Sequence, residues 1–182
     1  MKRIALCIGN DDYKILPKLN CAVADATAIE KALKELGFDT ELKTNLNREE
    51  LAYTIFSFEE KIENYDVILI YYAGHGFQTN GDNILAPIDL NIQDHSKIVG
   101  YNSFLLSDLM EILNRFPNQI KIVILDACRE IIGTRGTVKD FAPILAPQSS
   151  IIAFSTLPGQ PSQENISIGH GKYTDALLKY IS

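Results

Sequence analysis

Five short apolar runs alternate along this chain with segments of helical periodicity, and this alternation limits the possible folds more than any other feature. The apolar runs predict strands at Arg3–Gly9, Phe38–Lys43, Asp66–Tyr72, Ile120–Leu125 and Ser150–Ser155. The periodic segments predict helices at Cys21–Leu36, Asn47–Glu63, Phe104–Phe116 and Lys172–Ile181. Strands that are apolar at consecutive positions are covered on both faces, and strands that alternate with helices pair in parallel. We therefore expect an α/β fold with a mostly parallel central sheet flanked by helices on both faces.

The length and charge of the chain restrict its organisation and its partners. Its 182 residues are close to the usual size of one domain, so we expect a single domain over residues 1–182. The net charge of −6 argues against nucleic acid as a partner, because sequence-independent binding needs a basic surface. No apolar run approaches the roughly 20 residues of a membrane-spanning helix, so we expect no membrane association.

The cysteines give a prediction about the compartment. Cys7, Cys21 and Cys128 are odd in number and widely spaced. This pattern argues against a disulfide framework or a zinc site and favours the reducing cytoplasm. Cys7 lies within a predicted strand and Cys21 lies near a predicted helix start, without a histidine predicted near either. We therefore interpret these two cysteines as structural.

A possible general base and a possible nucleophile follow two of the predicted strands. His75 comes shortly after Asp66–Tyr72, and Cys128 comes shortly after Ile120–Leu125. Ligands of open parallel sheets bind beyond the carboxyl ends of the strands, so both residues are expected at the ligand-binding edge. A thiol becomes a useful nucleophile when a base is near, and imidazole is the natural base at neutral pH. We expect His75 and Cys128 to form a catalytic pair, with the amides of Gly76 and Cys128 as an oxyanion hole.

Alternative interpretations exist for each of these residues. A single cysteine is more often a small buried apolar residue, and a single histidine is more often structural. Their expected meeting at one sheet edge favours the catalytic interpretation. The segment Gly169–Gly171 repeats the Gly-His-Gly pattern, but it does not follow a predicted strand, so we expect no site there. Gly171-Lys172 also imitates the end of a phosphate loop, but Ile166 occupies the place of the required earlier glycine.

Two segments around the candidate pair resemble a known family. Tyr-Tyr-Ala-Gly-His-Gly (71–76) and Leu-Asp-Ala-Cys-Arg (125–129) resemble the caspase-like cysteine peptidases of the metacaspase and paracaspase branch, peptidase C14. The separation of His75 and Cys128, about 50 residues, also matches caspases. The similarity extends over nearly the whole chain and implies a caspase-like fold. It further implies that His75 is the general base and Cys128 the nucleophile of an endopeptidase with an acyl-enzyme intermediate.

The resemblance also implies a substrate class. This branch cleaves protein or peptide substrates after Arg or Lys and uses acidic residues in its primary specificity pocket. The matching positions are Asp25 and Asp126, with Glu164 as a third acid. Carboxylates bind a guanidinium group through paired hydrogen bonds, which agrees with a basic residue at the cleaved bond. The alternatives are a solvated Asp25 on the first helix and a strand-end hydrogen bond for Asp126.

Some metacaspases require calcium, but Asp82, Asp89 and Asp94 do not form a recognisable calcium loop. We therefore expect neither a metal nor a cofactor. A homodimer or an activating partner protein remains open. The alternative function is a catalytically silent caspase-like scaffold or interaction domain.

Overall fold

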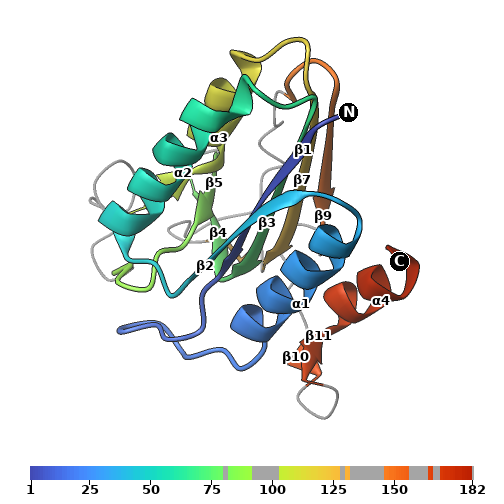
Figure 1. The fold of residues 1–182 in the computed structure, drawn as a ribbon. Coiled ribbons are helices and arrows are strands. Elements are labelled where there is room, and N and C mark those ends of the chain that lie inside the picture. Colours follow the sequence, from blue (N-terminus) through green and yellow to red (C-terminus); the bar gives the residue numbers. More distant parts are fainter. Residues whose placement is uncertain are drawn as a thin grey trace.

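A five-stranded parallel sheet forms the centre of the computed structural model, in which residues 1–79, 82–91, 103–127, 130–131, 146–155, 164–165 and 169–181 are described. The strand order is β2-β1-β3-β7-β9, and each neighbouring pair is parallel (Figure 1). The strands are β1 (Arg3–Gly9), β2 (Asp39–Thr44), β3 (Val67–Gly74), β7 (Ile120–Ala127) and β9 (Ser150–Phe154). All eight residues of β3 are buried, as expected for a strand covered on both faces.

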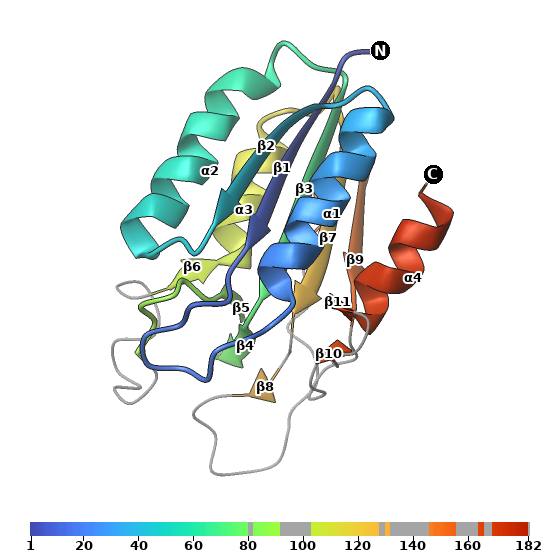
Figure 2. The same ribbon diagram turned by 60° about the horizontal axis from the view of Figure 1, so that its bottom comes forward.

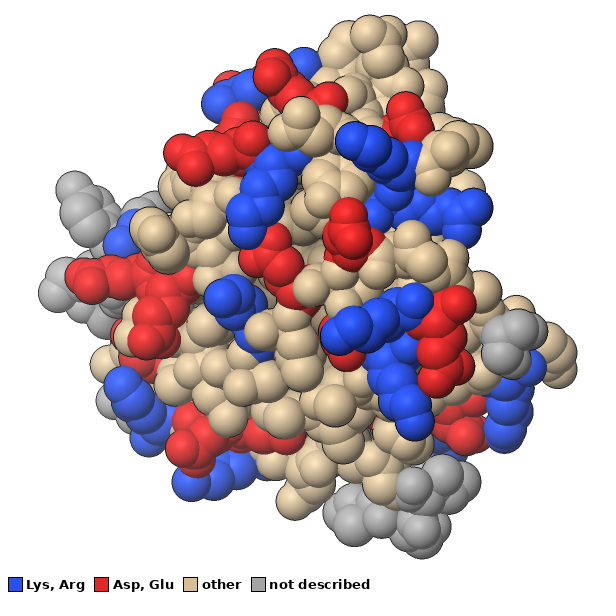
Figure 3. Space-filling view, viewed as in Figure 1, with Lys and Arg blue, Asp and Glu red and all other residues tan. Residues whose placement is uncertain are grey.

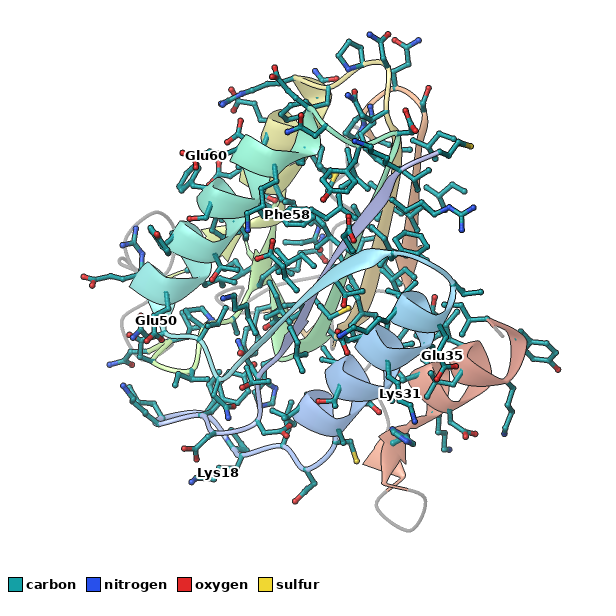
Figure 4. All side chains as sticks on the ribbon, in the orientation of Figure 1. Lys18, Lys31, Glu35, Glu50, Phe58 and Glu60 are labelled. Carbon is teal, nitrogen blue, oxygen red and sulfur yellow. The ribbon has the colours of Figure 1, made fainter. Side chains whose placement is uncertain are left out.

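Helices cover both faces of this sheet, which confirms the predicted α/β architecture. The helices are α1 (Ala22–Glu35), α2 (Arg48–Ile62), α3 (Leu106–Asn114) and α4 (Lys172–Tyr180). Helices α2 and α3 pack on one face, and α1 and α4 pack on the other (Figure 1). Phe58 of α2 points toward the sheet, whereas Glu50 and Glu60 lie on the outer side of the helix (Figure 4).

Local sequence signals account for two of the helix ends. Asn47 accepts a hydrogen bond from the Glu50 amide, and the Glu50 carboxylate accepts one from the Asn47 amide. This capping box starts α2 where the sequence predicts it. After α1, Gly37 adopts a positive φ of 78°, which favours glycine and turns the chain into β2.

Strands β3 and β7 extend two residues further than the sequence predicts. Ala73 pairs with Asp126 and Gly74 pairs with Ala127, because each strand continues to find a hydrogen-bonding partner in the other. The expectation that Asp126 follows its strand is therefore wrong, since Asp126 is the penultimate residue of β7.

Short strands extend the fold at the carboxyl edge of the main sheet (Figure 2). A second sheet has the order β6-β5-β4-β8, and a separate antiparallel pair joins β10 to β11. These elements are β4 (Gly76–Thr79), β5 (Asp82–Leu85), β6 (Phe104–Leu105), β8 (Glu130–Ile131), β10 (Glu164–Asn165) and β11 (His170–Gly171). The prediction that a helix begins at Phe104 is wrong, because Phe104 pairs with Leu85 of β5 and the helix starts at Leu106.

Charged side chains of both signs are interspersed on the face seen in Figure 3. Exposed ion pairs such as Lys18–Asp12 and Lys34–Glu30 also join opposite charges on the surface. Within the part of the chain that the structure describes, no helix is long and apolar enough to cross a membrane.

Candidate active site

Two buried tyrosines hold the backbone of His75. The His75 amide donates a hydrogen bond to the Tyr13 hydroxyl at 2.8 Å, and the Tyr72 hydroxyl donates to the His75 carbonyl at 2.9 Å. The rings of Tyr13 and His75 also pack together, with centroids 4.5 Å apart. A Cβ on Gly74 would lie 2.6 Å from the Tyr13 hydroxyl oxygen, so the residue before His75 must be glycine for this arrangement to form.

The imidazole of His75 has a defined tautomer. Its Nε2 lies 2.8 Å from the carbonyl oxygen of Pro17. A carbonyl oxygen only accepts hydrogen bonds, so Nε2 carries the hydrogen. In the neutral ring Nδ1 is then unprotonated and available as a base. The sequence reasoning missed Pro17, because a backbone carbonyl leaves no signature in the residue type.

The peptide of Gly76 is oriented by the pairing of β4 with β5. The Ala86 amide donates to the His75 carbonyl at 3.1 Å, so these two residues form a hydrogen-bonded pair. In an antiparallel ladder, opposite residues alternate between hydrogen-bonded and non-hydrogen-bonded pairs. The next pair, Gly76 with Leu85, is therefore non-hydrogen-bonded. The Gly76 amide consequently points away from β5.

The predicted nucleophile, Cys128, lies outside the described residues. In the sequence it directly follows Ala127, the last residue of β7. Ala127 is the register partner of Gly74, which directly precedes His75. The strands that lead to His75 and to Cys128 are therefore neighbours in the sheet.

The two predicted pocket acids lie close together. Asp25 of α1 is 3% exposed and Asp126 of β7 is 6% exposed. A Cβ on Gly171 would lie 3.0 Å from Oδ2 of Asp25 and 3.1 Å from Oδ2 of Asp126. The two carboxylates thus converge on the backbone of Gly171. The third predicted acid, Glu164, is in β10 and pairs with Gly171, but its side chain lies outside the described residues.

The carboxylates of Asp25 and Asp126 each have specific hydrogen-bond donors. The Gly171 amide lies 3.0 Å from Oδ2 of Asp25, and Nδ1 of His170 lies 2.7 Å from Oδ1 of Asp25. The Thr174 hydroxyl donates to Oδ2 of Asp126 at 2.7 Å. Burial raises the pKa of Asp25, and the hydrogen bonds from Gly171 and His170 partly oppose this rise. These two donors therefore favour the ionised form of Asp25.

His170 and Thr174 contact the two candidate pocket acids, and sequence reasoning missed both of them. The segment Gly169–Gly171, where the sequence predicts no site, lies beside a candidate pocket acid, because His170 contacts Asp25. The two-residue pair β10–β11 positions this segment, and a pairing so short has no recognisable periodicity. The available signal was the repeated Gly-His-Gly pattern itself.

Two of the acids considered for calcium have other partners. Asp82 accepts hydrogen bonds from the Asn83 amide and the Ser107 hydroxyl, and Asp89 accepts one from the Arg48 amide. Asp94 lies outside the described residues. Across the described ranges, no group of three or more His, Cys, Asp or Glu side chains is arranged to hold a metal ion.

The parallel sheet, the histidine after β3 and the buried acids together define a caspase-like α/β protein. The family model of the caspase domain, Peptidase_C14, matches residues 2–182, and the chain belongs to this family. The predicted family membership and fold class are thus confirmed.

Curated relatives and solved structures agree with this assignment. The chain is 26% identical over 143 residues to the human mucosa-associated lymphoid tissue lymphoma translocation protein 1, covering 79% of this chain and 16% of that protein. It is 24% identical over 192 residues to the Dictyostelium discoideum paracaspase, covering 99% of this chain and 44% of the relative. The chain thus spans less than half the length of either relative.

The fold also resembles solved structures over nearly the whole chain. Caspase-1 from Spodoptera frugiperda superposes with a TM-score of 0.73 at 21% identity, covering 98% of this chain and 68% of that chain. A protein of solved structure from Geobacter sulfurreducens superposes with a TM-score of 0.72 at 18% identity, covering 98% and 81% of the two chains. At these identities the similarity demonstrates a shared fold.

Proposed function

We propose that residues 1–182 act as one catalytic domain, a cytoplasmic cysteine endopeptidase that cleaves protein or peptide substrates after Arg or Lys. The observation that most supports this proposal is the convergence of Asp25 and Asp126, both almost fully buried, on one point beside α4. Two buried carboxylates repel each other and are poorly solvated, so a cation that enters between them is strongly favoured. A guanidinium or ammonium group of the substrate supplies that cation, and Glu164 is proposed as a third acid of the pocket.

In the proposed mechanism, Nδ1 of His75 accepts the thiol proton of Cys128. The thiolate attacks the carbonyl carbon of the peptide bond and forms a C–S bond. The amides of Gly76 and Cys128 donate hydrogen bonds to the resulting oxyanion. The intermediate collapses by breaking the C–N bond, and the leaving amine takes the proton from His75.

A water molecule completes the reaction. It attacks the thioester carbonyl while His75 accepts its proton, and the C–S bond then breaks. The proton returns from His75 to the sulfur of Cys128, which restores the starting state. The hydrogen bond between Nε2 of His75 and the Pro17 carbonyl supports this cycle, because it orients the ring and stabilises the imidazolium form.

The alternative function is a catalytically silent scaffold. Hydrolysis of fluorogenic peptides distinguishes the peptidase from the scaffold. The wild type and Cys128→Ala are compared on peptides ending in Arg, Lys or Asp, at several protein concentrations. We expect cleavage after Arg and Lys that is lost in Cys128→Ala. A rate per protein that rises with concentration would indicate an active homodimer. Absence of cleavage at every concentration, also with a candidate activating partner, would favour the scaffold.

A further inference from the structure

His170 is an ionisable side chain in contact with one of the pocket acids. Its Nδ1 lies 2.7 Å from Oδ1 of Asp25, and β11 packs against the first turns of α1 and α4 (Figure 2). The His170 side chain is 27% exposed, whereas that of Asp25 is 4% exposed. His170 is therefore a partly exposed side chain that contacts a buried carboxylate.

The hydrogen bond persists in both charge states of the imidazole. A carboxylate only accepts hydrogen bonds, so Nδ1 of His170 carries a hydrogen whether the ring is neutral or charged. Protonation therefore takes place at Nε2 and adds a positive charge without removing the contact with Asp25. Imidazole is the side chain whose charge ordinarily changes between pH 5 and 8.

We propose that His170 is a specificity-determining residue, which competes with the basic side chain of the substrate for the negative charge of Asp25. This proposal rests on the proposed function. With His170 neutral, the charge of both carboxylates is available to an arginine side chain. With His170 protonated, part of that charge is already compensated, and the preference for a cationic side chain falls. By linkage, binding of the cation must in turn promote loss of the proton from His170.

The surroundings of His170 determine the direction of this coupling. The ionisable groups on neighbouring elements are Asp25 of α1, Asp126 of β7, and Lys172, Tyr173 and Asp175 of α4. Glu164 lies in β10, the strand that pairs with β11, and its side chain is outside the described residues. A guanidinium group bound beside Asp25 and Asp126 would oppose a positive charge on His170, because the two cations would share the same carboxylates.

Calorimetry with a non-reactive ligand tests this coupling without relying on hydrolysis. The protein is the full chain with Cys128→Ala, and the probe is Nα-acetyl-arginine amide, in buffers of different ionisation enthalpy near pH 6.5. We expect binding to release a fraction of a proton and the affinity to rise about fivefold or more between pH 5.5 and 7.5. The matched variant adds His170→Asn, because the asparagine amide can donate to Asp25 but cannot ionise. It is expected to release fewer protons on binding and to show a weaker dependence of affinity on pH, because only Asp25, whose pKa is raised by burial, still titrates in the pocket.

The outcomes separate this proposal from the proposed function. Equal proton release with and without His170→Asn would overturn the role of His170 and leave the basic-residue pocket intact. Failure of the probe to bind either protein at any pH would remove the pocket and the His170 proposal together. If His170→Asn does not fold, NMR titration of the His170 ring in the Cys128→Ala protein replaces it. The titration midpoint is expected to fall on saturation with the probe, and an unchanged midpoint would contradict the proposal.

Discussion

At the scale of single residues, the hydroxyl of Tyr13 has an unusual position for a buried phenol. It accepts a hydrogen bond from the His75 amide and lies within 3.4 Å of the Tyr72 hydroxyl. Burial raises the pKa of Tyr13, so the phenol stays neutral throughout the physiological pH range. Its role is thus to position His75 through neutral hydrogen bonds.

Substitution Tyr13→Phe keeps the ring and removes only this hydroxyl. We expect the free energy of unfolding to fall by about 1–3 kcal/mol, because the His75 amide loses a buried partner. We also expect kcat to fall more than KM changes, because the base is less well positioned. Urea unfolding and peptide hydrolysis measure the two effects. Tyr65→Phe, which loses an exposed hydrogen bond to Asp39, is the control, and an equal loss of kcat in both variants would contradict the positioning role.

Asp25 is expected to reduce stability at neutral pH. Its pKa in the folded protein is raised, chiefly by burial, above the unfolded value of about 3.9. The carboxyl group therefore favours folding most below the unfolded pKa, and this contribution is lost as the pH rises through the folded pKa.

Asp25→Asn consequently has opposite expected effects on folding and binding. The urea midpoint at pH 7 should rise above that of the wild type, and the difference should vanish near pH 3. Cleavage after Arg should fall by roughly 30-fold or more, as when one partner of a buried charge pair is removed. Asp39→Asn, at an exposed position, is the control for both measurements. A lower midpoint for Asp25→Asn at pH 7 would show that its hydrogen bonds outweigh the cost of burial.

At the scale of elements, the junction of β11 with α4 leaves little space beside Asp25 and Asp126. Gly171 has a φ of −62°, which any residue can adopt, so only space restricts its side chain. A Cβ there would lie about as close to the carboxylates of Asp25 and Asp126 as contacts in proteins permit. Gly37 is the opposite case, with a φ of 78° and, beyond its chain neighbours, no atom within 4 Å of its Cβ position.

These two glycines give a matched pair of alanine substitutions. Gly171→Ala should raise KM for arginine peptides several-fold, because the methyl group crowds Asp25 and Asp126. Gly37→Ala should leave KM unchanged and lower the free energy of unfolding by about 1–2 kcal/mol through backbone strain. Michaelis kinetics and urea unfolding of both variants check this. An unchanged KM for Gly171→Ala would mean that arginine does not enter near this junction.

Predictability from sequence also differed between kinds of element. The main strands and helices were predictable because their apolar patterns extend over many residues, as in β3 and α2. Asp25 and Asp126 were identified by resemblance, and the structure brings them together. The contact of His170 with Asp25 was not predictable, because it joins positions 145 residues apart through a two-residue strand.

At the scale of the whole molecule, the candidate site gathers segments from most of the chain at one sheet edge. The loop with Pro17, the end of β3, the end of β7 and the start of α4 all contribute to it. The parallel order β1-β3-β7 places these strand ends side by side, so the fold itself assembles the site. Cys7 and Cys21 are buried away from solvent, and burial raises the pKa of Cys7 to about 12.

The central claim is that Cys128 is a nucleophile served by an acidic pocket, and covalent labelling tests it most directly. The intact protein is treated with a peptide chloromethyl ketone ending in arginine, and the adduct is located by mass spectrometry. Displacement of chloride by the thiolate leaves a stable thioether. We predict one adduct per chain, on Cys128, with little labelling by the matched aspartate probe and a strong reduction in Asp25→Asn. Labelling on Cys7 or Cys21, or equal labelling by both probes, would contradict the claim.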